Sequence, residues 1–157
     1  MRIIDFRARP STQEYMSYFD TPGKREGAAA KGKPVPEATT LKEFMASLEG
    51  AGISTIVYTG RDNRSIGGWH VPNEFIAQCV QKYPDRIVGV AGIDPNKPRS
   101  QILKDLDHAI NTLGLRGVCM DVGRYQWGPN DRRLYPIYER CIELEIPIIL
   151  TMGPAVN

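Results

Sequence analysis

The sequence predicts an α/β protein built from parallel (β/α) units. After an opening strand and a long connection, helical and strand patterns alternate four times along the chain. Strands 87–93 and 146–151 are apolar on both faces, as parallel strands covered on two sides must be. Strict alternation requires right-handed crossovers and a parallel sheet, and the length suits one domain over residues 1–157.

The opening strand, predicted over residues 2–6, runs directly into two arginines. Alternation along a strand places Arg7 and Arg9 on the same face, at the strand's C-terminal end. Paired guanidiniums are costly to desolvate unless they meet carboxylates or a bound anion. This end of the strand is therefore either an anion-facing site or an exposed end with two solvated arginines.

The connection from residue 10 to residue 39 is expected to be irregular. Its middle, residues 22–36, contains almost no large apolar side chains. Loops of this length in compact domains are usually functional lids or disordered segments. We expect residues 22–36 to form a flexible loop.

The four following helices each begin or end at a recognisable signal. Thr40 and Glu43 form a capping box, Pro72 suits a first helical turn, and Gly114 closes the third helix. The expected helices span residues 40–51, 72–83, 98–113 and 131–145, and the strands that follow them span 53–59, 87–93, 115–122 and 146–151. Two architectures fit this order: an open doubly wound sheet, or the first five strands of a (β/α)8 barrel. No glycine-rich phosphate turn follows the first strand, which disfavours a dinucleotide-binding fold.

In both architectures, binding and catalytic residues gather where the strands end. The strand ends carry four arginines and two interleaved aspartates: Arg7, Arg9, Arg61, Arg124, Asp94 and Asp121. Arginines arranged in this way suit a small carboxylated or anionic ligand held by bidentate hydrogen bonds, with Asp121 or Asp94 as the catalytic group for proton transfer. Alternatively, the aspartates cap loops and pair with the arginines structurally.

Composition argues against several other classes of function. A formal net charge of +2 gives no general affinity for nucleic acid or membrane. No apolar run approaches the roughly 18 residues of a membrane span, and no signal peptide is evident, so we expect a cytoplasmic protein. Three scattered cysteines in apolar segments indicate reduced core thiols. Of the two histidines, His108 is expected on the surface, and His70 is the one placed near a possible site.

Short segments spread over nearly the whole chain, outside residues 22–36, resemble the amidohydrolase-2 family. They are Ile3-Ile4-Asp5, Gly60-Arg61, Val71-Pro72-Asn73-Glu74, Tyr83-Pro84-Asp85-Arg86 with Val88-Gly89-Val90, Ile93-Asp94-Pro95, Gly117-Val118, and Asn130-Asp131 through Ile137-Tyr138. This group of the amidohydrolase superfamily includes aminocarboxymuconate-semialdehyde and resorcylate decarboxylases. The resemblance implies a (β/α)8 barrel that hydrolyses or decarboxylates small, often carboxylated substrates with the help of a metal.

The resemblance also shows where this sequence departs from the family. The family commonly opens with Asp-x-His-x-His, whose histidines bind the metal, and those positions are Arg7 and Arg9 here. A guanidinium stays protonated and cannot ligate a metal. The next family ligand would fall near Thr151, and the ligands on strands six and eight have no counterpart in this chain. We therefore expect neither a metal nor another cofactor.

Against the family pattern, this sequence covers five strands of the barrel, and the last three (β/α) units are absent. Such a half barrel exposes strand edges and apolar side chains, so we expect a homo-oligomer. Three functions remain open: a metal-free hydrolase or decarboxylase with an arginine-rich site, a non-catalytic anion-binding or assembly protein, and a regulatory domain with an open doubly wound sheet.

Overall fold

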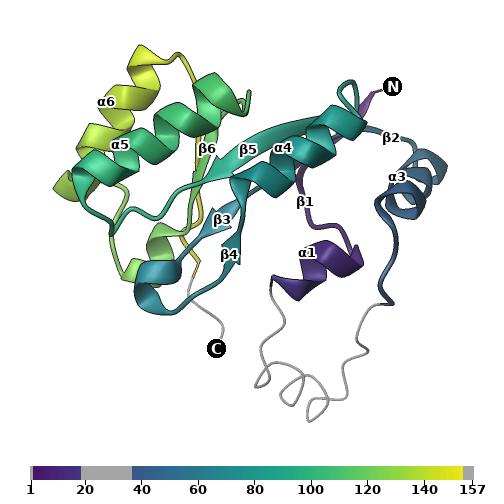
Figure 1. Cartoon of the computed structure of the whole chain (residues 1–157), viewed down its shortest axis with the longest axis horizontal. Helices are drawn as coiled ribbons and strands as arrows, with labels where there is room; N and C mark the ends of the chain where they lie inside the picture. Colours follow the sequence, from purple (N-terminus) through teal and green to yellow (C-terminus); the bar gives the residue numbers. More distant parts are fainter. Residues whose placement is uncertain (1, 19–36, 154–157) are drawn as a thin grey trace, which may run out of the picture.

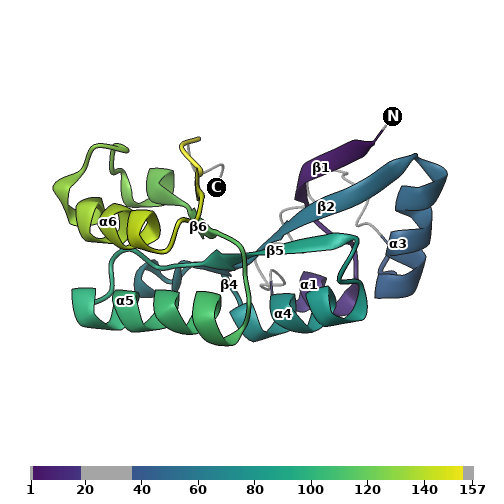
Figure 2. The ribbon, with the colours of Figure 1, turned by 90° about the horizontal axis from the view of Figure 1, so that it is seen from above.

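The computed structural model describes residues 2–18 and 37–153. Its five-stranded parallel sheet has the order β1-β2-β5-β6-β7. The strands are β1 (Ile3–Ala8), β2 (Ile53–Thr59), β5 (Ile87–Gly92), β6 (Val118–Met120) and β7 (Ile148–Leu150). Figure 2 shows that the strands follow a curved surface that opens on one side. The predicted partial (β/α) barrel is thereby confirmed, and the doubly wound alternative is wrong.

The helices lie mainly on the outer face of this curved sheet (Figures 1 and 2). They are α1 (Gln13–Ser17), α3 (Leu41–Gly50), α4 (Asn73–Lys82), α5 (Arg99–Asp107) and α6 (Tyr135–Glu143). A π-helical turn (His108–Thr112) continues α5, and short 3-10 helices cover Arg64–Ile66, Val122–Tyr125 and Arg132–Leu134. None of the described helices is long and apolar enough to cross a bilayer.

The capping box predicted at the start of α3 is present. The Thr40 hydroxyl accepts a hydrogen bond from the Glu43 amide at 3.2 Å, and the Thr40 amide donates to the Glu43 carboxylate at 2.8 Å. These bonds satisfy groups that the first helical turn would otherwise leave unpaired, which is why the helix begins here.

The prediction that residues 10–39 are irregular throughout is wrong at α1. Thr12 caps this short helix by accepting a hydrogen bond from the Tyr15 amide at 3.3 Å. Thr12 and Thr39 form a β-bridge that brings the two ends of the connection together. Tyr15 is buried and packs on Tyr58 with ring centroids 5.4 Å apart, so tertiary packing stabilises a segment too short to form a helix alone. The flexible loop expected over residues 22–36 lies outside the described residues.

The core lies mostly between the sheet and the outer helices. Along β2, Ile56 and Tyr58 are fully buried on the helix side, whereas Val57 packs with Val90 and Cys119 in a small separate cluster. All three cysteines are buried and free, as predicted. His108 is exposed, also as predicted, and its Nε2 lies 3.6 Å from Glu74 Oε1.

A close approach between two backbone segments fixes the C-terminal end of β2. A Cβ atom at Gly92 would lie 2.2 Å from the backbone nitrogen of Arg61, and one at Gly60 would lie 2.7 Å from the nitrogen of Gly92. The Asn73 side chain locks this contact, because its Oδ1 accepts from the Gly92 amide at 2.8 Å and its Nδ2 donates to the Gly92 carbonyl at 3.2 Å. Arg61 then begins the short strand β3 (Arg61–Asp62), which pairs with β4 (His70–Val71). The backbone that carries Arg61 is therefore held on two sides.

Candidate functional site

A buried ion pair joins the segments that follow β2 and β6. Arg61 Nη1 donates to Asp121 Oδ2, and each side chain is only 4% exposed. Asn63 Nδ2 donates to the same Asp121 oxygen at 2.9 Å. The structure thus brings together two of the residues predicted at the strand ends.

The environment of this pair favours its charged form. Burial raises the pKa of Asp121, but the Arg61 charge and the Asn63 hydrogen bond outweigh it, so the pKa lies below its usual value. Burial also lowers the pKa of Arg61, and the Asp121 charge more than reverses that effect. Asp121 is therefore a carboxylate at neutral pH.

Asp94 lies at the end of β5 and holds together the loops around it. Its carboxylate accepts from the Ser65 amide and hydroxyl, both at 2.8 Å, from the Asn96 amide at 3.0 Å, and from the Tyr125 hydroxyl at 2.9 Å. The Tyr125 hydroxyl also lies 3.4 Å from Asn63 Oδ1. One buried network therefore connects Asp94 to Asp121, and four donors already occupy the Asp94 carboxylate.

Two further arginines lie close to the ion pair. Arg7 and Arg9, at the end of β1, are both exposed. Burial of part of the side chain lowers the pKa of Arg9, and the positive charges of Arg61 and Arg7 lower it further. Arg9 is therefore near enough to both Arg7 and Arg61 for their charges to act on it, and we call these three residues the arginine cluster.

The fourth predicted arginine is placed differently. The Arg124 guanidinium lies over the Trp69 ring, 4.3 Å from its centroid. This is a cation-π contact.

Three residues that the strand-end pattern does not predict complete the network: Asn63, Ser65 and Tyr125. Asn63 and Ser65 closely follow Gly60-Arg61, so extending the strand-end rule by a few residues would have found them. Tyr125 carries no comparable signal. Its position depends on the 3-10 helix Val122–Tyr125 and on the left-handed backbone of Gln126, at φ 57°.

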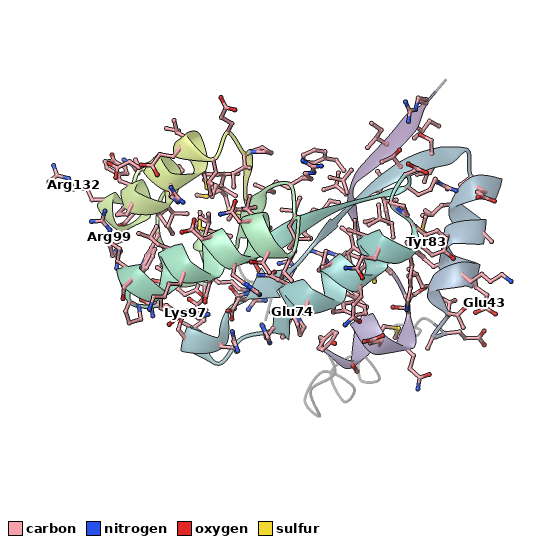
Figure 3. The ribbon with its side chains drawn as sticks, turned by 45° about the horizontal axis from the view of Figure 1, so that its top comes forward. Glu43, Glu74, Tyr83, Lys97, Arg99 and Arg132 are labelled. Carbon is pink, nitrogen blue, oxygen red and sulfur yellow. The ribbon has the colours of Figure 1, made fainter. Side chains whose placement is uncertain are left out.

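Two cavities lie elsewhere among the described residues. One, of about 320 Å³, lies between the N-terminal turns of α5 and α6, and another, of about 290 Å³, lies among α1, α3 and α4. Figure 3 shows Lys97, Arg99 and Arg132 together at the α5 and α6 end. Lys97 and Arg99 line the first cavity, and neither cavity is lined by a residue of the arginine cluster.

The groups around the ion pair do not suit a metal ion. Within residues 2–18 and 37–153, no three His, Cys, Asp or Glu side chains are arranged to hold one. Asp121 is already neutralised by Arg61, and the neighbouring Arg7 and Arg9 have no lone pair to offer. Burial raises the pKa of the nearby Cys119 thiol to about 11, so it stays protonated at neutral pH.

Comparison with known proteins shows which family the chain belongs to. The chain is 28% identical over 93 residues to a 2-keto-4-carboxy-3-hexenedioate hydratase from Sphingobium sp., a match that covers 54% of this chain and 27% of the hydratase. It is 28% identical to an uncharacterised TIM-barrel protein from Bordetella bronchiseptica, with a TM-score of 0.76 over 99% of this chain and 58% of that one. A 5-carboxyvanillate decarboxylase from Novosphingobium aromaticivorans, solved with manganese, has the same fold at 16% identity, with a TM-score of 0.61 over 94% of this chain and 49% of that one.

This chain therefore spans about half the length of the similar structures and about a quarter of the curated relative. The amidohydrolase family matches residues 4–156, which is nearly the entire sequence. The resemblance noted in the sequence is confirmed, and the chain belongs to the amidohydrolase family.

Proposed function

We propose that the arginine cluster binds a small carboxylated molecule, as part of a hydrolase or decarboxylase of the amidohydrolase family. The observation that carries this proposal is the charge at the site, where the buried Asp121 carboxylate neutralises Arg61 and the exposed Arg9 and Arg7 follow close by. The surplus of two positive charges suits a ligand with two negative ones. The hydratase and decarboxylase described above support the proposal, because their names specify carboxylated compounds.

In this proposal the residues have distinct roles. Arg7 and Arg9 are exposed and bind the ligand carboxylates, while Arg61 keeps one Nη free of Asp121. Negative charge that develops during the reaction is stabilised by guanidiniums instead of a metal. We assign proton transfer to Asp121 and not to Asp94, because four donors already occupy the Asp94 carboxylate. Arg124, which stacks on Trp69, has an outer position and could reach a ligand only by leaving that ring.

Replacing both exposed arginines should abolish most of the binding. Each charge-assisted hydrogen-bonding pair contributes roughly 1.5–3 kcal/mol, so Arg7→Ala with Arg9→Ala should weaken binding of succinate about a hundredfold or more. Isothermal titration calorimetry measures this directly. The matched control is Arg99→Ala with Arg132→Ala, which removes the same charge from two exposed arginines at the α5 and α6 end (Figure 3). Unchanged affinity in the Arg7 and Arg9 variant would show that these arginines are solvated strand ends.

A non-catalytic anion-binding or assembly protein is the second candidate. It is favoured by the engagement of both aspartates, since Asp121 is paired with Arg61 and Asp94 ties loops together. Ligand binding by the arginine cluster without turnover of any carboxylated substrate would support it.

For either function we propose that the protein is cytoplasmic. The three cysteines of the chain are free thiols, and free thiols suit a reducing compartment.

We also propose that this 157-residue chain self-associates through the surface around β1. That strand is an edge of the sheet and exposes large apolar side chains, with Ile4 57% and Phe6 63% accessible. A second copy would cover both the open edge and these side chains. Sedimentation at micromolar concentration should show a dimer or larger species, and Ile4→Ser with Phe6→Ser should shift it toward monomer. Ile142→Ser, which changes an exposed residue on α6, is the control, and a monomeric wild-type chain would contradict the proposal.

A further inference from the structure

The cavity at the α5 and α6 end of the molecule has no part in the proposed function. It lies between the N-terminal turns of the two helices and has a volume of about 320 Å³. Small-molecule sites typically have volumes of roughly 300–1,000 Å³ and a mainly apolar lining. The apolar residues that line this cavity are Pro95, Ile102, Leu103, Trp127, Pro136 and Ile137. Its size and lining therefore suit a small molecule with an apolar body.

The polar part of the lining is cationic. It consists of Asn96, Lys97, Arg99 and Arg133, and none of the described residues that line the cavity is acidic. Lys97 Nζ is already paired, because it lies 2.7 and 2.8 Å from two carboxylate oxygens. Arg133 is paired as well, since it donates to the two oxygens of Asp131 at 2.8 and 2.6 Å. Two of the cations are therefore neutralised by carboxylates behind the lining.

Arg99 is the cation that remains. Its side chain is exposed, and it forms no hydrogen bond or ion pair with residues 2–18 or 37–153. The charges of the lining and of its paired carboxylates therefore leave Arg99 uncompensated. A single negative group on a ligand would complement this charge.

Trp127 gives the cavity a rigid aromatic wall. The Arg133 guanidinium lies 3.7 Å from the centroid of the Trp127 ring, and the centroids of the Tyr125 and Trp127 rings are 5.3 Å apart. These contacts hold the indole in one orientation before a ligand arrives. A planar apolar group that packs on a preorganised ring loses less free energy to ordering than one that must fix a mobile side chain.

We propose that this cavity is a second binding site, for a small planar molecule with an apolar body and one anionic group. The anionic group pairs with Arg99, and the apolar body packs on Trp127 and the aliphatic side chains. None of the lining residues belongs to the arginine cluster, so the inference does not depend on the proposed function. Succinate carries two negative charges and has no apolar body to cover this lining, so it is not a ligand of this site.

The test compares 2-naphthoate with 2-naphthol, because they share one planar ring system and only the first is an anion at pH 7. In calorimetric titrations of the 157-residue chain, 2-naphthoate should bind about ten- to a hundredfold more tightly than 2-naphthol. Arg99→Ala should bring this ratio close to one, and Trp127→Leu should weaken both compounds about two- to tenfold while preserving the ratio. The matched control is Arg132→Ala, which removes an exposed arginine at the same end of the molecule that does not line the cavity, and it should change neither affinity (Figure 3).

A competition experiment separates this site from the arginine cluster. Excess succinate should leave the affinity for 2-naphthoate unchanged, because the two acids occupy different sites. Displacement of 2-naphthoate by succinate, equal affinity for 2-naphthoate and 2-naphthol, or an unchanged ratio in Arg99→Ala would overturn the second site. Absence of succinate binding, together with the expected effect of Arg99→Ala, would overturn binding by the arginine cluster and leave the cavity site intact.

Discussion

Asp121→Ala is expected to lower the free energy of unfolding by about 3–5 kcal/mol, because it leaves the buried Arg61 charge without its partner. Both side chains are 4% exposed, so water cannot replace the lost carboxylate. The variant also removes the acceptor for the Asn63 amide. Urea unfolding followed by circular dichroism at pH 7 measures the loss.

The control for this variant is Glu143→Ala, which removes an ion pair with Arg140 on α6. Its Glu143 side chain is 62% exposed, so the expected cost is below about 0.5 kcal/mol. The pKa of Asp121 is lowered in the folded chain, so its ionic contribution is present above the unfolded pKa and is lost as pH falls through the folded one. The difference between wild type and Asp121→Ala should therefore shrink below about pH 4, given an unfolded pKa near 3.8. An equal loss of unfolding free energy in the two variants at pH 7 would show that burial does not strengthen the dependence of Arg61 on Asp121.

Gly92→Ala should be the most damaging single-methyl addition, costing about 3 kcal/mol or preventing folding. The new Cβ would lie 2.2 Å from the Arg61 nitrogen and 2.4 Å from its Cα, and backbone on both sides must then move. Because Arg61 follows this contact directly, anion binding should weaken along with stability. Urea unfolding and succinate titration on the same preparation test both effects.

Gly50→Ala provides the comparison for Gly92→Ala. A Cβ at Gly50 would meet nothing within 4 Å, and the residue lies in α3. Alanine is favoured over glycine in helices, so this variant should gain roughly 0.5–1 kcal/mol. A folded Gly92→Ala variant with wild-type stability would show that β2 and β5 can separate without cost at this point.

The alternating pattern predicts the strands well because each one is buried between layers and must be apolar. Prediction is poorer where tertiary contacts decide the conformation. The strand expected over residues 115–122 is reduced to Val118–Met120, since the chain turns into a 3-10 helix at Val122. Likewise, α1 depends on the packing of Tyr15 against Tyr58, and these two residues are 43 positions apart in the sequence.

The candidate site shows the same division between local and tertiary information. Strand-end positions correctly bring Arg61 near Asp121, because parallel strands end at one edge of the sheet. The strand-end positions alone do not show whether the Arg61 guanidinium faces a ligand or Asp121, because that depends on the distances between the loops. Nor could sequence position reveal that Arg124 would stack on Trp69 instead of joining the arginine cluster.

We propose that guanidiniums, without a metal, supply the positive charge that binds a carboxylated ligand. Calorimetric titration of succinate before and after removal of metals by chelation and dialysis tests it most directly, with bound metal quantified in both samples. We predict the same affinity in both samples, with no stoichiometric metal in either. Loss of binding after chelation, restored by zinc or manganese, would contradict the account.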